Sequence, residues 1–227
     1  MGIQNGPPIE TTGLEYYVDP ANTKSYVDGN TTATDLVSNK NAFLQSGTGF
    51  ASINAGVFDF DGTDDNLALQ TTITTSHLTY SVWYRPDTSD TSFRTLGQTG
   101  AWSTTNFACF FSKNGPGLSL SLVTKFNNTR TDSSFPTSIN PNFSNSWHNA
   151  TFVIEPLTQY IYYNGQYCNS STRTINTDIT INTLNIGQTM GYGPFGGQLG
   201  ATMLYSRALA PNEIKQNYNA MRGRYGI

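Results

Sequence analysis

Apolar and polar residues alternate along several short stretches of this chain. In Leu78–Tyr84 every second residue is apolar or aromatic, with Thr79 and Ser81 between them, until Arg85–Pro86 ends the pattern. Leu118–Leu122 alternates Leu with Ser in the same way. Because successive side chains of a strand point to opposite faces, this period of two predicts β-strands with one buried face.

A β-hairpin is predicted at Asn164–Gly165, since both residues tolerate the positive φ of a type I′ turn. Two strand-like runs precede it, Thr151–Ile154 and Gln159–Tyr163, and Glu155–Pro156 forms a turn between them. Clusters of Gly, Asn, Asp and Ser separate the other apolar runs. Further strands are expected at Leu14–Val18, Val57–Phe60, Asn66–Leu69, Phe107–Ser112, Leu184–Ile186 and Leu199–Tyr205.

One segment near the C-terminus has the period of an α-helix. Its apolar face is made of Ile214, Tyr218 and Met221. Pro211 suits the first turn, where its missing N–H costs no hydrogen bond, and Glu213 suits the positive end of the helix dipole. We expect Gly223 to stop this helix.

Many strands with a single terminal helix indicate an all-β protein with antiparallel sheets. A β-sandwich, a jelly roll and a closed barrel all fit, and periodicity does not choose among them. At 227 residues, with no evident linker, the chain is expected to form one domain.

Composition and charge exclude several classes of function. Only 12% of the residues are charged and the net charge is −3, so no basic surface for nucleic acid is expected. The apolar runs are too short to span a membrane, and Met1–Glu10 does not resemble a signal peptide, which favours a protein made in a cytoplasm. Cys109 and Cys168 are therefore expected to be free thiols.

Four stretches of the sequence resemble the concanavalin A-like lectin and glucanase superfamily, specifically its laminin-G-like and pentraxin-like domains. The first two are like an early strand with a Phe-Asp-Gly turn and a strand that ends in a basic residue and Pro. The third is like a Trp-His strand with its hairpin, and the fourth is like a closing strand and helix. The stretches are Val57–Asp65; Leu78–Pro86; Trp147–His148 with Val153–Gly165; and Phe195–Gly200 with Tyr205–Ile214.

This resemblance implies an antiparallel β-sandwich, a concanavalin A-like jelly roll with one short C-terminal α-helix. We divide the chain into an N-terminal arm, residues 1–12, and a single lectin-like domain, residues 13–227. Tyr17–Tyr26, followed by Asp35–Leu36 and Asn39–Asn41, further resembles virion proteins of tailed phages of marine bacteria. In such proteins these domains decorate capsids or form tail and fibre parts.

The chemistry that an enzyme of this superfamily needs is not evident in the sequence. Retaining glucanases use two carboxylates about 5 Å apart, usually on one strand. Here the four glutamates, Glu10, Glu15, Glu155 and Glu213, stand apart. Gly191–Gly196 matches the letters of a dinucleotide-binding loop, but a strand and not a helix is expected after it, so no cofactor is predicted.

Two groups of residues are candidates for ligand binding. Asp61, Asp64 and Asp65 form a local carboxylate cluster, and such hard oxygen ligands can hold calcium, although Asp-rich turns are common without a metal. Glycan recognition uses aromatic faces beside polar groups, and Trp102, Tyr192 and Phe195 are the candidates for that role.

The sequence therefore leads to two hypotheses. The first is a non-enzymatic virion structural protein that contacts other capsid or tail proteins, associates with copies of itself and is located in the virion. The alternative is a carbohydrate-binding adhesin that recognises a glycan on the host surface, with calcium as a candidate cofactor. Neither hypothesis involves nucleic acid or a membrane.

Overall fold

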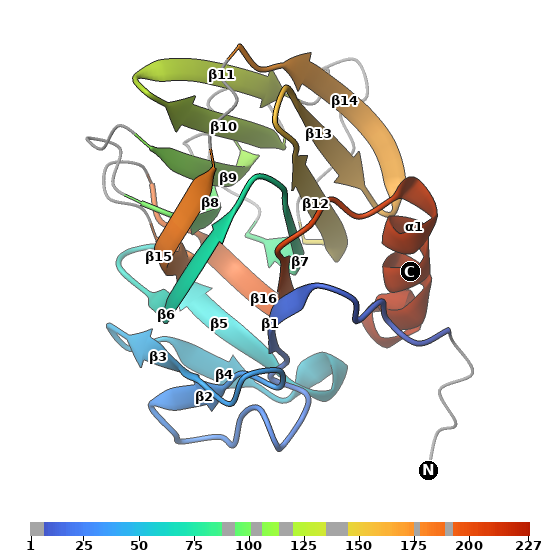
Figure 1. Ribbon diagram of the computed structural model, residues 1–227. Coiled ribbons are helices and arrows are strands. Elements are labelled where there is room, and N and C mark those ends of the chain that lie inside the picture. Colours follow the sequence, from blue (N-terminus) through green and yellow to red (C-terminus); the bar gives the residue numbers. More distant parts are fainter. Residues whose placement is uncertain are drawn as a thin grey trace.

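The computed structural model describes residues 7–87, 94–100, 106–113, 120–134, 145–174, 178–188 and 193–227. These residues form two β-sheets that pack face to face, with one α-helix near the C-terminus (Figure 1). The strand pairs described within each sheet are antiparallel. The expected antiparallel sandwich with a short C-terminal helix is thus confirmed.

Each sheet brings together strands that lie far apart in the sequence. Sheet A contains, in spatial order, β14 (Gln166–Thr172), β13 (Thr158–Tyr163), β12 (His148–Ile154), β7 (Leu78–Pro86), β16 (Gly196–Tyr205), β5 (Val57–Asp61) and β4 (Gly49–Ala51), and β1 (Leu14–Val18) also pairs with β16. Sheet B contains β11 (Thr129–Ser134), β10 (Ser121–Phe126), β9 (Phe107–Lys113), β8 (Arg94–Gln98), β15 (Ile179–Ile186), β6 (Asn66–Thr75), β3 (Asn41–Gln45) and β2 (Thr32–Thr34).

The main core lies between the two sheets and follows from the alternation in β7. Leu78, Tyr80, Val82 and Tyr84 point into this core, and Tyr80 donates its hydroxyl to the carbonyl of Leu96 across the sandwich at 2.9 Å. The residues between them point to the outer face of sheet A. Strand periodicity therefore assigns the two faces of β7 correctly.

Helix α1 (Pro211–Met221) covers the middle of the outer face of sheet A (Figure 1). Trp83 of β7 stacks on Tyr218 of the helix, with 5.7 Å between ring centroids, and on Tyr225, at 4.3 Å. The α-helix ends at Met221, two residues before the glycine at which the sequence predicted a stop. The chain continues as a 3-10 helix, Arg222–Tyr225, and turns at Gly226 with φ 75°, because the buried Tyr225 ring holds this segment on the sheet.

The predicted hairpin is confirmed by φ values of 49° at Asn164 and 71° at Gly165. Several strands are longer than their patterns indicated, because backbone pairing continues through polar residues: Asn66–Leu69 extends to Thr75. Of the predicted Leu118–Leu122 strand, residues 118 and 119 lie outside the described part, and β10 begins at Ser121.

The described part of the N-terminal arm lies along α1. Gln216 donates its side-chain amide to the Pro8 carbonyl at 2.8 Å, and the Glu10 amide donates to Asn217 at 2.7 Å. Tyr205 of β16 donates its hydroxyl to the Glu10 carbonyl at 2.9 Å. The arm is therefore fixed to the same domain from Pro8 onward.

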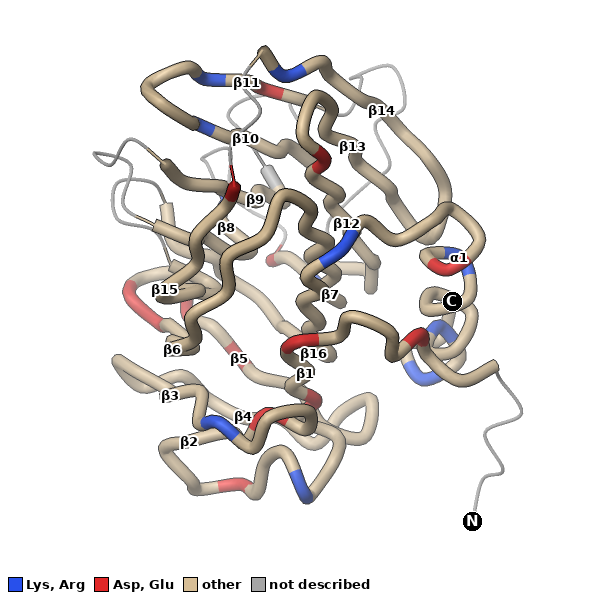
Figure 2. Tube along the Cα trace, viewed as in Figure 1, with Lys and Arg blue, Asp and Glu red and all other residues tan. Residues whose placement is uncertain are grey.

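Charged residues are sparse and scattered over both sheets in the described chain (Figure 2). Among the described residues, no helix is both long and apolar enough to cross a bilayer. Cys109 is buried, Cys168 is partly buried, and both are free thiols.

Candidate functional site

The structure brings the three predicted metal ligands together at the turn between β5 and β6. Asp61, Asp64 and Asp65 each place a carboxylate oxygen within 4.8 Å of the other two. Asp65 accepts the Asp61 amide at 2.7 Å, and Asp61 accepts the Thr63 amide at 2.7 Å. Burial, with the charges of neighbouring aspartates, raises the pKa of Asp65. These backbone bonds are those of an Asp turn, so calcium binding stays a prediction.

The three predicted aromatic ligand residues do not form a described surface. Trp102 and Tyr192 lie outside the described residues. Phe195 is fully buried, and its ring meets Phe60 and Tyr84 edge-on, with centroids 6.2 and 6.3 Å away. The prediction for Phe195 is therefore wrong, because the apolar ring fills the space between the sheets instead of facing solvent.

Two glutamates that are distant in sequence meet at one arginine. Arg207 forms an ion pair with Glu213 at 2.8 Å and another with Glu10 at 3.5 Å. Hydrogen bonds from Thr12 lower the pKa of Glu10, and the Arg207 guanidinium lowers that of Glu213. A general acid of a glycosidase needs the opposite shift, so this pair is suited to fastening the arm and helix together.

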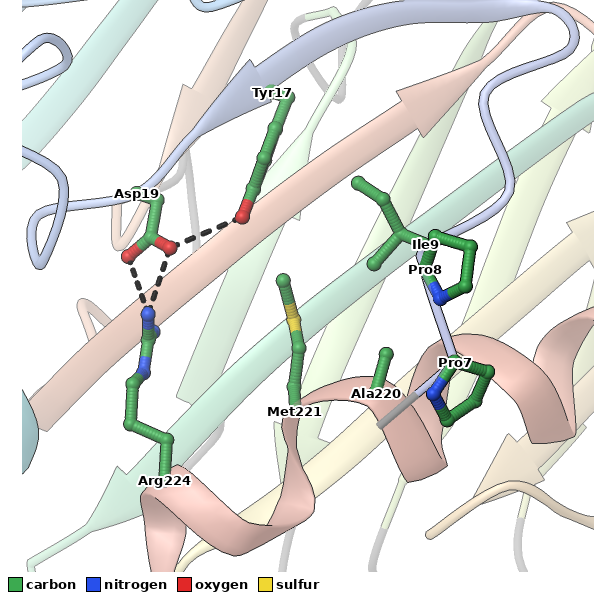
Figure 3. A pocket seen from close by; sticks show the side chains of 8 residues that line it. All are labelled: Pro7, Pro8, Ile9, Tyr17, Asp19, Ala220, Met221 and Arg224. Carbon is green, nitrogen blue, oxygen red and sulfur yellow. Dashed lines mark hydrogen bonds and ion pairs between the residues drawn. The ribbon is translucent and has the colours of Figure 1, made fainter. Parts of the chain in front are cut away.

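A cavity of about 420 Å³ opens between the N-terminal arm and the C-terminal helix (Figure 3). Its apolar wall consists of Pro7, Pro8, Ile9, Ala220 and Met221. At its polar end, Arg224 bonds both oxygens of Asp19 at 2.7 and 2.8 Å, and Tyr17 donates its hydroxyl to Asp19 at 3.0 Å. Because these groups bind one another, the cavity presents mainly carbon, and its polar end serves as a brace between β1 and the C-terminus.

A cluster of tyrosines that is partly open to solvent lies on the outer face of sheet A, at the edge formed by β13 and β14. We call Tyr160, Tyr162 and Tyr167 the tyrosine platform. Tyr167 is 57% exposed and Tyr160 is partly exposed, whereas Tyr162 is buried. Tyr162 and Tyr167 are cross-strand partners, with ring centroids 5.9 Å apart at 76°. The platform thus offers an aromatic face to solvent.

Polar groups border this platform. The Tyr160 hydroxyl donates to the Glu155 carboxylate at 3.3 Å, and the hydroxyls of Tyr167 and Ser170 are 3.0 Å apart. Leu157, in the turn before β13, is 55% exposed and adds apolar surface. Ring faces beside a carboxylate and hydroxyls are the kind of surface that can bind a sugar.

The strands beneath the platform are fixed to sheet B. Gln159, which is fully buried, donates to the carbonyls of Leu122 and Thr131 at 3.1 and 3.3 Å and accepts the Thr124 hydroxyl at 2.6 Å. Asn169 donates to the Ser134 carbonyl at 2.6 Å. The platform therefore rests on a rigid support, which limits the entropy lost when a ligand binds.

Sequence reasoning missed the tyrosine platform, although a signal was present. The two-residue turn at Asn164–Gly165 pairs Tyr163 with Gln166 and hence Tyr162 with Tyr167. Alternation then places Tyr160 on the same face as Tyr162. The sequence pattern could have placed these three rings on one face, but it could not show that the fold leaves Tyr167 and part of Tyr160 exposed.

The family model of the concanavalin A-like lectin/glucanases superfamily matches residues 60–215, well over half of the sequence. The chain belongs to this superfamily. Its laminin-G-like resemblance agrees with the two antiparallel sheets described above. No curated protein matches the sequence.

Solved structures with similar folds include a domain of an arabinanase and the binding domains of protein toxins. Domain 4 of AbnA, a GH43 extracellular arabinanase from Geobacillus stearothermophilus, in complex with arabinotriose, has a TM-score of 0.70 at 15% identity, and the match covers 90% of this chain and 98% of that one. The binding domain of Paraclostridial Mosquitocidal Protein 1 has a TM-score of 0.71 at 16% identity, and the match covers 92% of this chain and 52% of that one. The botulinum neurotoxin serotype D ligand binding domain in complex with N-acetylneuraminic acid has a TM-score of 0.67 at 13% identity, and the match covers 91% of this chain and 50% of that one.

This chain thus spans about half the length of the two toxin domains. At such low sequence identity, the similarity shows a shared fold and does not place a ligand.

Proposed function

We propose that this chain is a non-catalytic module that binds glycan through the tyrosine platform. The observation that carries the proposal is the exposure of Tyr167 beside Tyr160 and the Glu155 carboxylate, on a face where Trp83 and Tyr205 are covered. Sugars pack their C–H faces on aromatic rings and direct their hydroxyls to planar polar groups, and this surface offers both. The arabinotriose and N-acetylneuraminic acid complexes of domains with the same fold support glycan as the class of ligand.

A non-catalytic role is supported by the state of the carboxylates. Glu10 and Glu213 have lowered pKa values and share Arg207, so neither is poised to give up a proton near neutral pH. At the tyrosine platform, Glu155 is the carboxylate described beside the rings, whereas retaining glycoside hydrolysis needs two.

The proposal is tested with a glycan array followed by titration calorimetry of each hit. Tyr167→Ala should weaken binding at least about tenfold, which corresponds to about 1.4 kcal/mol. Phe43→Ala is the matched control, because Phe43 is a ring with 40% exposure on sheet B, at the opposite face of the sandwich. A wild-type protein that binds no glycan on the array, with or without calcium, would rule out the function.

A second candidate role is that of a virion structural protein, made in a host cytoplasm and carried on a capsid or tail. The resemblance of Tyr17–Tyr26 and Asn39–Asn41 to phage virion proteins favours it. It is compatible with glycan binding, since an adhesin can be part of a particle. Light scattering should then give a discrete multimer, and the protein should bind purified particles; a monomer that never binds them would contradict this role.

A calcium ion held by Asp61, Asp64 and Asp65 is proposed as a structural addition to either role, because carboxylate oxygens are its preferred ligands. Repeating the array and the light scattering with a chelator tests whether the ion matters to binding or to assembly.

A further inference from the structure

The tyrosine platform carries a negative charge at its border. The Glu155 carboxylate lies 3.3 Å from the Tyr160 hydroxyl. Burial raises the pKa values of Tyr160 and Tyr162, and the Glu155 charge raises both further. The rings therefore remain neutral phenols at physiological pH, and the charge at this surface comes from the carboxylate.

Glu155 is held in place by its backbone. Its amide donates to the Thr158 carbonyl at 2.8 Å, and Arg173 donates to its carbonyl at 2.5 Å. The Arg173 amide closes the same turn on the Leu157 carbonyl at 2.8 Å. The turn therefore fixes where the carboxylate emerges beside the rings.

Two cations near the platform, Arg173 and Lys215, direct their charged groups at rings outside it. Arg173 is only 2% exposed, and its guanidinium stacks 4.5 Å from the centre of the Phe126 ring, inside the fold. Lys215 of α1 holds its ammonium 5.1 Å from the centre of the Tyr218 ring. The Glu155 carboxylate, by contrast, is hydrogen-bonded to a ring of the platform itself.

We propose that the tyrosine platform selects uncharged glycans and rejects those whose bound unit carries a carboxylate. This inference rests on the proposed glycan-binding function and names the ligand class of the same site. Glu155 accepts hydrogen bonds from sugar hydroxyls, which a neutral sugar supplies. A sialic or uronic acid would instead bring a second negative charge close to Glu155 at a partly desolvated surface, where like charges repel more strongly than in water.

The test uses glycans matched in core structure and different in charge. Lactose and 3′-sialyllactose form one pair, and arabinotriose and galacturonic acid trisaccharide provide a further neutral and acidic probe. Binding to the wild-type protein, to Glu155→Gln and to Tyr167→Ala is measured by calorimetry in low salt. Glu15→Gln is the control, because Glu15 lies on β1, outside the tyrosine platform, and accepts the Ser206 hydroxyl.

We expect the wild type to bind neutral probes at least about tenfold more tightly than acidic ones. Glu155→Gln should narrow this difference to less than about threefold, and Glu15→Gln should leave it unchanged. Preferential binding of acidic probes, or a preference that survives Glu155→Gln, would overturn the charge selection while glycan binding itself stands. Neutral binding that survives Tyr167→Ala would place the site elsewhere, and the absence of binding to every array glycan would overturn the function.

Discussion

Beside α1, Trp83 on the outer face of sheet A is buried, whereas Tyr160 of β13 and Tyr167 of β14, on the same face, reach solvent. Trp83 is fully buried between the sheet and the rings of Tyr218 and Tyr225. Tyr167, on the same face, keeps 57% of its surface exposed. An aromatic ring that the fold covers contributes to stability, and one that the fold leaves open is free to contribute to binding. The comparison predicts that substitutions of the covered rings mainly lower stability, whereas substitutions of the exposed rings mainly weaken binding.

The largest effect is expected in the covered half. Trp83→Ala would leave a cavity beneath α1 and remove both stacked contacts, lowering the free energy of unfolding by about 3–5 kcal/mol. Urea denaturation with a constant m-value measures it, and Trp83→Phe, which retains a ring, should lose less. A loss below about 1 kcal/mol would mean that the helix does not depend on this contact.

The next largest effect is expected at the ion pair that fixes the segment after α1. Arg224 follows α1 and pairs with Asp19 at 2.7 Å, with side-chain exposures of only 13% and 8%. Arg224→Met would leave a largely buried carboxylate without its counter-ion, at a cost of about 2–4 kcal/mol. The matched control is Arg130→Met, because the Arg130–Asp132 pair is 48% and 41% exposed and should contribute less than about 1 kcal/mol. Equal losses in the two variants would contradict the role of the brace.

In the open half, the effect on stability should be small. Tyr167→Ala is expected to cost about 0.5–1 kcal/mol, because the ring loses its edge contact with Tyr162 but little buried surface. The same urea titration measures this loss, and circular dichroism confirms that the variant is folded before its glycan binding is interpreted. A loss as large as that of Trp83→Ala would show that the platform is part of the core.

Much of the fold could be predicted from local patterns. The alternation in Leu78–Tyr84 assigned both faces of β7, and Asn164–Gly165 gave the hairpin that aligns Tyr162 with Tyr167. The face that remains open could not be predicted in this way, because it depends on where α1 packs. Phe195 shows the same limit: a ring in a glycine-rich loop looks available, yet its neighbours Phe60 and Tyr84 come from strands distant in sequence.

The position of the candidate metal site could be predicted from the sequence, but whether a metal ion occupies it could not. Asp61, Asp64 and Asp65 lie within one turn, so proximity in sequence is enough to bring their carboxylates together. Whether a cation binds depends on how the mutual repulsion of these charges balances against the backbone hydrogen bonds that already use some of their oxygens.

The smallest effect is expected at this acidic turn. It follows β5 of sheet A and exposes carboxylates to solvent, whereas the β13–β14 edge exposes aromatic rings. Because the pKa of Asp65 is raised in the folded state, the folded protein binds this proton more tightly than the unfolded chain does. Ionised Asp65 therefore weakens the fold above its folded pKa, and the penalty disappears as the pH falls through that value. Asp64→Asn removes one repelling charge. At pH 7 in chelator, we expect it to raise the free energy of unfolding by less than about 0.5 kcal/mol, which a small rise in melting temperature would report.

That gain should shrink as the pH is lowered, whereas Asp178→Asn, at an exposed carboxylate outside the turn, should show no comparable trend. Calcium separates the two interpretations of the turn. If the three carboxylates hold the ion, calcium stabilises the wild type by mass action and Asp64→Asn loses that stabilisation. If they only form an Asp turn, calcium shifts neither protein, and Asp64→Asn remains the more stable of the two. In calcium, a wild type more stable than Asp64→Asn thus indicates a metal site. A variant more stable than the wild type indicates an Asp turn without bound calcium.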